Sequence, residues 1–281
     1  MSATVPVLYI DPVAGASGDM FLGAFADLGA DFDALRAMLD TLKIPGFRLE
    51  RAPALRHTIG GTKVDVVVED VPHPHRHVGD LLAIVDAAPL PERVKQRSRA
   101  VLMRLANAEA AVHRMPVERV HLHEVGGLDA LVDVVGTCAA LEILGVDRIY
   151  SGPVSLGTGT VACAHGKMPS PAPGTLAILE GFPVRKTSIN HEMTTPTGAA
   201  ITAALATGFV EPLVMVPRRV GYGAGSSDPR EFCNMLRLVL ADVPRKLIPA
   251  HHHASDPGRH HDHDHAHDHG HAHDHGHAHP H

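Results

Sequence analysis

The sequence predicts an α/β body of mixed α+β character, followed by a disordered, histidine-rich C-terminal tail. Strand-like and helix-like segments alternate along the body, 44% of the 281 residues are hydrophobic, and the composition changes abruptly near Pro249. Such alternation favours a sheet covered by helices. We therefore divide the chain into a body, residues 1–248, with a candidate subdivision into two subdomains near residues 72–90, and a tail, residues 249–281.

The first third of the body begins with a strand–loop–helix unit. A short apolar run predicts a buried strand, and the Gly-rich segment after it predicts a loop. Two strand-like stretches on either side of a Gly pair predict a hairpin. The expected elements are a strand over 5–11, a loop over 12–20, helices over 21–29 and 31–42, and a hairpin over 47–70 that turns at 59–61.

The rest of the body alternates long helical patterns with short strands. A loop rich in Pro and His, residues 71–80, comes first, and Pro91 then marks a helix start. Gly145 marks the end of a later, apolar helix. The expected elements are helices over 92–114 and 128–144, a strand over 148–151, a Gly-, Pro- and Thr-rich stretch over 152–225 with short strands and one helix over 197–206, and a final strand over 235–241.

Charge and cysteine content narrow the classes of function. The net charge is −6, of which the tail carries −4 through five Asp and one Arg, so the body carries −2. A nearly neutral body without a basic stripe does not favour nucleic acid or an anionic membrane as partner. Three scattered cysteines do not predict a disulfide framework, and no apolar run of about 20 residues predicts a membrane span. We expect a cytoplasmic protein.

The tail predicts binding of divalent transition metals. It holds 15 of the 24 histidines, mostly at every second position and interleaved with Asp, Ala and Gly. Neutral imidazole binds Ni, Cu, Zn and Co, and a segment without large apolar residues is expected to be disordered. An expression tag is the alternative, although a tag is usually an unbroken His run. The tail alone does not identify the metal.

The body contains further candidate metal ligands in two groups. Alternating histidines place their rings on one side of an extended backbone, and residues four apart share one face of a helix. A solvated loop with accidental histidines is the alternative for the first group. The first group is His73, His75 and His77, and the second is Glu109, His113, His121, His123 and Glu124.

Two more pairs of residues carry possible metal chemistry. Asp129 and Asp133 are four apart on an otherwise apolar helix, so they indicate metal coordination or the orientation of His ligands, with a helix cap and a solvated face as alternatives. Cys163 and His165 could ligate one metal, but a buried thiol beside a structural histidine is equally consistent.

Two loops are candidates for holding a phosphate. The loop GASGDM offers Ser17 and Gly18 at a helix start, where anions bind, but it lacks the P-loop and GxGxxG patterns. The segment TTPTGAA also precedes a helix, and its Thr194, Thr195 and Thr197 could hold a phosphate or cap the helix. A metal-dependent phosphohydrolase is a third function class that these loops leave open.

Several segments together resemble the LarC-type nickel insertion proteins: LYIDPVAGASGDMFLGAFADLGA, PHRHVGDLLAIV, ANAEAAVHRMPVERVHLHEVGGLDALVDVVG, GTGTVACAHGKMPSPAPGTLAILEG, TTPTGAAI and VGYGAGSSD. The resemblance implies insertion of Ni²⁺ into pyridinium-3,5-bisthiocarboxylic acid mononucleotide by a lyase-class chelatase or cyclometallase. The product is the nickel-pincer cofactor of lactate racemase, which makes a racemase the expected client. Longer members continue into a C-terminal domain associated with CTP, so dependence on CTP with Mg²⁺ or Mn²⁺ would be supplied through a separate domain.

This resemblance, read with the residues, gives a working mechanism. The second group of ligands would hold Ni²⁺ with positions open for the thiocarboxylates. His165 would take the ring proton. Ser17 and Gly18, with the three threonines, would hold the phosphate, while Asp11 or Asp19 orients a ligand or a second cation. The alternative from another class is a non-enzymatic nickel store or metallochaperone.

Overall fold

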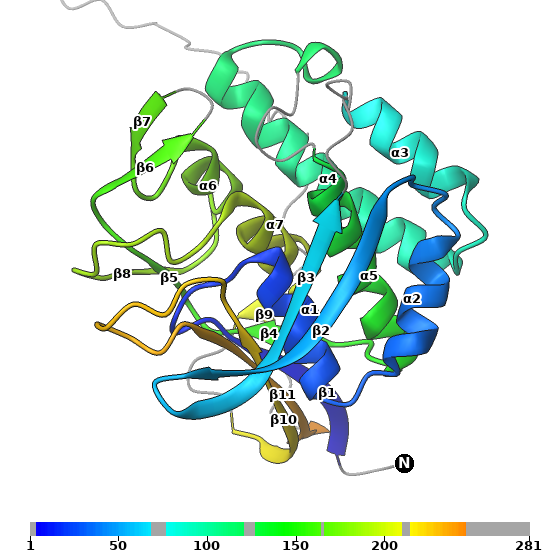
Figure 1. Ribbon diagram of the computed structural model, residues 1–281, viewed down its shortest axis with the longest axis vertical. Helices are drawn as coiled ribbons and strands as arrows, with labels where there is room; N and C mark the ends of the chain where they lie inside the picture. Colours follow the sequence, from blue (N-terminus) through cyan, green and yellow to red (C-terminus); the bar gives the residue numbers. More distant parts are fainter. Residues whose placement is uncertain (1–3, 69–76, 121–126, 164–165, 210–213, 246–281) are drawn as a thin grey trace, which may run out of the picture. The chain divides into compact units, whose positions relative to one another are not determined.

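A computed structural model describes residues 4–68, 77–120, 127–163, 166–209 and 214–245. Contacts divide the chain into residues 1–251 and residues 252–281, and all the described residues belong to the first unit. That unit is built on a seven-stranded mixed sheet with the strand order β2-β3-β10-β11-β1-β4-β9 (Figure 1). Its strands are β1 (Thr4–Asp11), β2 (Phe47–Arg56), β3 (Ile59–Val68), β4 (Ile149–Ser151), β9 (Gly208–Phe209), β10 (Val216–Ala224) and β11 (Met235–Pro244).

Helices and two small sheets complete the described part. One small sheet is a parallel pair, β5 (Val154–Leu156) and β8 (Val184–Lys186), and the other is an antiparallel pair, β6 (Thr160–Cys163) and β7 (Gly166–Pro169). The helices are α1 (Gly18–Asp27), α2 (Phe32–Asp40), α3 (Val78–Ala87), α4 (Glu92–His113), the 3₁₀ helix η1 (Val117–Arg119), α5 (Leu128–Ile143), α6 (Pro173–Ile178) and α7 (Pro196–Leu205).

The central strand β1 is buried on both faces. It pairs with β11 in antiparallel register and with β4 in parallel register. Because side chains alternate across a strand, Leu8 and Ile10 enter the main hydrophobic cluster, whereas Val7 and Tyr9 enter a second cluster with Val239. The carboxyl end of this buried strand leads directly into the loop before α1.

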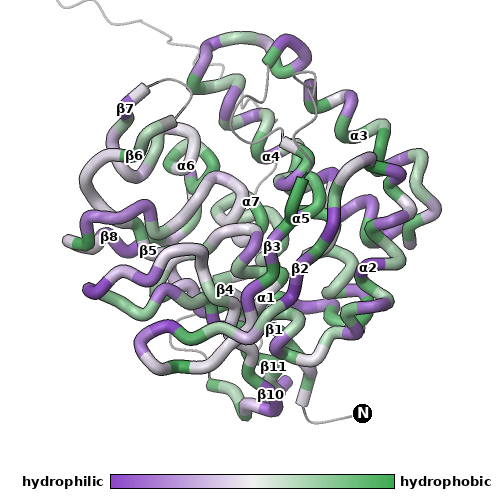
Figure 2. Tube along the Cα trace, viewed as in Figure 1, coloured by the Kyte–Doolittle hydropathy of each residue, from purple (hydrophilic) through white to green (hydrophobic). Residues whose placement is uncertain are grey.

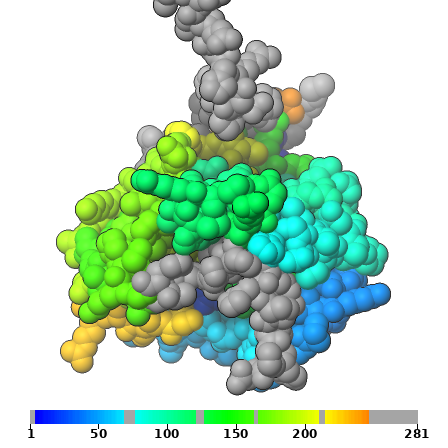
Figure 3. All heavy atoms as spheres, turned by 90° about the horizontal axis from the view of Figure 1, so that it is seen from above, coloured from blue at the N-terminus to red at the C-terminus, as the bar shows by residue number. Residues whose placement is uncertain are grey.

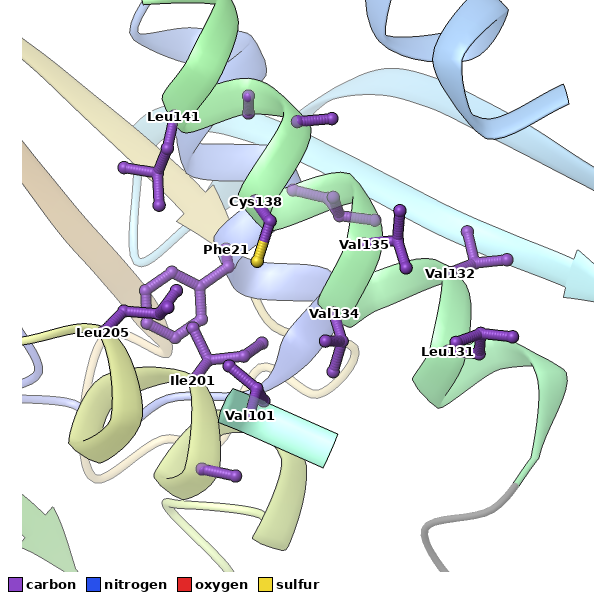
Figure 4. Packing of buried hydrophobic residues seen from close by; sticks show 14 of the residues in the cluster. Phe21, Val101, Leu131, Val132, Val134, Val135, Cys138, Leu141, Ile201 and Leu205 are labelled. Atoms are coloured by element: carbon purple, nitrogen blue, oxygen red, sulfur yellow. The ribbon is translucent and has the colours of Figure 1, made fainter. Parts of the chain in front are cut away.

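Helix α5 lies at the middle of the main cluster, and it is coloured hydrophobic along most of its length in Figure 2. Figure 4 shows Val134 and Cys138 of α5 directed toward Phe21 of α1, Val101 of α4 and Ile201 of α7. Burying one such aliphatic side chain is worth about 1.5–3 kcal/mol. This helix therefore holds α1, α4 and α7 together.

Helices α3 and α4 pack against each other and lie side by side on the face seen in Figure 3. The main cluster includes Val85 of α3 and Val94 of α4, together with Leu49 and Val64 of the β2–β3 hairpin. Residues before and after the segment 72–90 thus share one hydrophobic core. No helix in the described ranges is long and apolar enough to cross a membrane.

The mixed α/β fold class is confirmed, and most elements lie near their expected positions, but the hairpin turn differs. The turn consists of His57 and Thr58, both with positive φ (47° and 68°), instead of residues 59–61. Two consecutive positive φ angles are typical of a type I′ hairpin turn, which Asn-Gly usually signals. Gly61 has another role, because a Cβ there would lie 2.7 Å from the carbonyl oxygen of Tyr222.

Two helix starts were also predicted wrongly. Helix α1 begins at Gly18 rather than Phe21, so the loop is shorter than the Gly-rich composition suggested. Helix α3 begins at Val78, inside the segment expected to be a loop. The backbone N–H of His77 donates to Asp80 at 2.9 Å, which is a helix-start contact that the surrounding prolines and histidines obscured.

Candidate metal and cofactor site

The two candidate phosphate loops lie against each other. Ala16 and Thr194 form a parallel β-bridge, in which Ala16 N–H donates to Thr194 Oγ1 at 3.3 Å and Thr195 N–H donates to the Ala16 carbonyl at 3.0 Å. A Cβ on Gly198 would lie 2.1 Å from the Ala16 carbonyl oxygen, so only glycine permits this approach. Segments almost 180 residues apart therefore meet at the start of α1.

Asp19, in the first turn of α1, is the most connected polar side chain at this place. Its Oδ2 accepts from Lys63 Nζ on β3 at 2.6 Å and from Ser226 Oγ at 3.1 Å. Its Oδ1 accepts from the Ser17 hydroxyl and from Met20 N–H. An acidic side chain in a first helical turn interacts favourably with the helix dipole.

Asp133 of α5 approaches the same helix start from the other side. A Cβ on Gly18 would lie 2.2 Å from Asp133 Oδ2, which means that the carboxyl group packs directly against the Gly18 backbone. The residue as a whole is half-buried, but its Oδ1 is sealed from solvent and has no hydrogen-bond partner among the described residues. Burial, reinforced by the charges of Asp19 and Asp129, raises the pKa of Asp133 well above its usual range.

Lys63 is the cation within this acidic group. It donates to Asp65 at 2.6 Å as well as to Asp19, and its side chain is only 12% exposed. Burial alone would lower the pKa of Lys63, but the two carboxylates outweigh burial and raise it. The start of α1 therefore combines backbone N–H groups, hydroxyls, one fixed ammonium and several carboxyl groups, which can bind a zwitterionic or mixed-charge ligand.

The other sequence-predicted cofactor residues have these positions. Thr194 is buried, and its hydroxyl donates to the Ser155 carbonyl at 2.8 Å. Thr195 caps α7 by accepting from Gly198 N–H at 3.2 Å, and Thr197 is half-buried in the first turn of that helix. Asp11 forms an ion pair with Arg237 across the β1–β11 ladder, with Nε to Oδ2 at 2.8 Å.

Of the two groups of candidate metal ligands, three residues are described. His77 precedes α3, and its Nδ1 lies 3.0 Å from the Val120 carbonyl oxygen. Glu109 is buried, and its Oε2 lies 3.5 Å from His113 Nε2 one helical turn along α4. Within the described ranges, no three His, Cys, Asp or Glu side chains are grouped so that they could hold a metal ion. His73, His75, His121, His123, Glu124 and His165 lie outside the described residues.

Sequence reasoning missed Lys63, Ser226 and Arg237. Lys63 lies among other polar residues, Thr62 and Asp65, in an alternating strand, and its partner Asp19 is 44 residues away. Ser226 belongs to the segment VGYGAGSSD, which carried part of the family resemblance, so its involvement could have been anticipated. No local pattern in the sequence identifies the other two.

The segments that contact one another at the start of α1 all lie within a region that matches one protein family. A family model described as nickel insertion protein matches residues 8–271. The chain belongs to the nickel insertion protein family. The matched region, residues 8–271, includes nearly all of the described residues and extends into the tail.

The names of similar proteins agree with this family model. A protein of Citrifermentans bemidjiense, provisionally named a nickel insertion protein, is 44% identical over 236 residues, which cover 84% of this chain and 61% of the relative. One of Dictyoglomus thermophilum with the same name is 42% identical over 242 residues, covering 86% and 62%. The pyridinium-3,5-bisthiocarboxylic acid mononucleotide nickel insertion protein of Geobacillus kaustophilus is 39% identical over 248 residues, covering 85% and 60%.

The chain thus spans about six tenths of the length of these relatives. No solved structure matches it.

Proposed function

We propose that this protein inserts Ni²⁺ into pyridinium-3,5-bisthiocarboxylic acid mononucleotide. The observation that supports this most is the convergence of family segments at the start of α1. The loop before α1, the Asp133 turn of α5, the Thr194 loop and Ser226 are far apart in the sequence, yet they contact one another. The Geobacillus kaustophilus relative is named for this reaction.

The reaction joins nickel to two sulfur atoms and one ring carbon of the precursor. The C–H bond breaks, its electron pair forms the Ni–C bond, and the proton passes to a base. The N/O ligands we propose to hold Ni²⁺ are His121, His123 and Glu124, with Glu109 and His113 as the adjacent helical pair. His73, His75 and His77 form a second candidate set.

The mixed charge of the precursor fits the start of α1. Its pyridinium ring is cationic and suits the acidic side chains Asp19 and Asp65, whereas its phosphate and thiocarboxylates are anionic and suit Lys63 and the helix N–H groups. Ser17, Gly18 and Thr197 are the proposed phosphate contacts. Asp11, held by Arg237, and Thr194, buried against Ser155, keep the loops in place.

Dependence on CTP with Mg²⁺ or Mn²⁺ is proposed through a separate domain, because the relatives extend well beyond the matched region. The His-rich tail is proposed to raise the nickel concentration near the body, which increases effective molarity without a new contact. A client racemase would receive the finished cofactor.

Nickel storage or simple delivery is the competing function, and the 15 tail histidines favour it. The number of product molecules per protein separates the two. We expect the full chain, supplied with the separate domain proposed to bring CTP and with excess precursor, Ni²⁺, CTP and Mg²⁺, to form several nickel-pincer cofactors per molecule, counted by mass spectrometry. The same assay without CTP measures nucleotide dependence. A plateau at one transfer per bound nickel, however much precursor is present, would establish delivery instead.

A further inference from the structure

His191 is a histidine that the proposed mechanism does not yet use. It lies in the loop between β8 and α7, three residues before Thr194. Its position is tightly determined by its neighbours. A Cβ on Gly157 would lie 1.8 Å from the His191 carbonyl oxygen, and the ring packs against Phe232 with centroids 5.5 Å apart.

The ring of His191 is also oriented by a hydrogen bond. Its Nε2 lies 3.2 Å from Ser227 Oγ, and this hydroxyl accepts from Asn234 Nδ2 at 3.0 Å. Asn234 is buried, and its Nδ2 also donates to the Ser227 carbonyl at 3.1 Å. A hydroxyl oxygen can accept twice, so Ser227 can receive both Asn234 and an Nε2–H of His191. In that tautomer Nδ1 keeps its lone pair, and no described residue hydrogen-bonds it.

The same serine pair connects His191 to the start of α1. Ser226 donates to Asp19, and the next residue, Ser227, contacts His191. Arg56 fixes the backbone of this pair by donating from Nε to the Ser227 carbonyl at 3.1 Å. On the other side of the loop, a Cβ on Gly15 would lie 1.8 Å from the Met193 carbonyl oxygen. His191 therefore stands at the rim of the proposed precursor site, held from two directions.

The other described histidines are placed differently. His57 Nε2 lies 2.7 Å from the Pro229 carbonyl oxygen at a hairpin tip. His77 contacts Val120 at the start of α3, and His113 pairs with Glu109 on α4. Among the described histidines, only His191 contacts the Ser226–Ser227 pair itself, whereas His57 contacts the residues that follow this pair, Asp228 and Pro229.

We propose that His191 accepts the ring proton of the precursor during nickel insertion, and that Ser227 and Asn234 are positioning residues that hold its imidazole. The inference rests on the proposed function and gives His191 the role that the sequence suggested for His165. When the C–H bond breaks, its electron pair forms the Ni–C bond and the proton moves to Nδ1 of His191. The imidazolium then releases this proton to solvent, so no further reactant is required.

The test compares full-length variants at saturating Ni²⁺ with protiated and ring-deuterated precursor. Loss of a general base typically slows a reaction by a factor of roughly 100 or more. We expect His191→Gln to lose about that factor in kcat, with KM and nickel binding little changed and with a larger deuterium isotope effect. Ser227→Ala should be slowed less, by roughly tenfold, and should show the same rise in isotope effect. His57→Gln, on the adjacent hairpin tip, is the matched control and should behave as the wild type.

The outcomes separate the two proposals. A wild-type protein that forms no product contradicts the proposed function itself. An active wild type together with a His191→Gln variant of unchanged rate and isotope effect overturns the role of His191 alone. If His191→Gln does not fold by circular dichroism, Ser227→Ala decides, and an unchanged rate and isotope effect in that variant would also overturn the proposal.

Discussion

The start of α1 and the end of α4 both collect polar residues, but they do so in different ways. At the start of α1, Asp19 is bonded to Lys63 and Ser226, which are 44 and 207 residues away in the sequence. At the end of α4, Glu109 and His113 are one helical turn apart. The first arrangement requires the whole fold to form, whereas the second needs only the helix.

This difference shows that the polar group at the start of α1 depends on tertiary contacts, whereas the α4 pair depends on local helical spacing. Backbone segments around the start of α1 approach so closely that glycine is required at Gly15 and Gly198, and the Asp133 side chain packs equally closely against Gly18. Such contacts fix side chains within the short distances that catalysis and binding need. The pair on α4 is set by helical spacing, and the buried Glu109 also packs against α6, where a Cβ on Gly174 would lie 2.8 Å from its Oε1.

The largest expected effect is a loss of folding stability when one of the closest backbone approaches is disturbed. Gly15 has φ of +89°, and a Cβ there would lie 1.8 Å from the Met193 carbonyl oxygen. Gly15→Ala should therefore lower the free energy of unfolding by about 3 kcal/mol or more, through overpacking and backbone strain. Urea denaturation measures this. Gly60→Ala, where nothing lies within 4 Å, is the control and should change the free energy by less than about 0.5 kcal/mol. Equal effects at both positions would mean that the loops do not meet as described.

A smaller change in folding stability is expected from Asp133 as the pH changes. Because its pKa is raised in the folded state, the folded protein holds this proton more tightly than the unfolded chain does. Its contribution to stability is present below about pH 4, the usual Asp pKa, and is lost as the pH rises toward the folded value. The melting temperature of Asp133→Asn relative to wild type should therefore rise from pH 4 to pH 8. A flat difference would mean that Asp133 is ionised and compensated in the folded protein.

Local patterns predicted the local structure of this protein well. Strand β1, helix α2 and the long helices α4 and α5 follow from apolar periodicity, Pro91 and Gly145, which act within a few residues. The α4 pair of Glu109 and His113 was found in the same way. The position of the hairpin turn was harder to predict, because His57 and Thr58 adopt positive φ without the usual Asn-Gly sequence.

The strand order and the partners of the site residues could not be derived locally. Asp11 pairs with Arg237 across 226 residues, and nothing near Asp11 indicates a cation. Likewise, nothing near Gly18 in the sequence indicates that Asp133 packs against it. The histidine proposed as base, His191, has no neighbouring histidine or carboxylate at metal-ligand spacing except Glu192, so its sequence context did not single it out.

Binding of the nickel-free precursor tests most directly whether the start of α1 is the precursor site. The Ser17→Ala/Thr197→Ala double variant removes two hydroxyl groups proposed to contact the phosphate, and each hydrogen bond to a charged group is worth about 1.5–3 kcal/mol. We predict that calorimetric titration gives a dissociation constant raised at least roughly tenfold for this variant. The control His113→Ala, at the end of α4, should bind the precursor like the wild type. A double variant with wild-type affinity, beside a His113→Ala protein that no longer binds the precursor, would contradict the account and move the precursor site to α4.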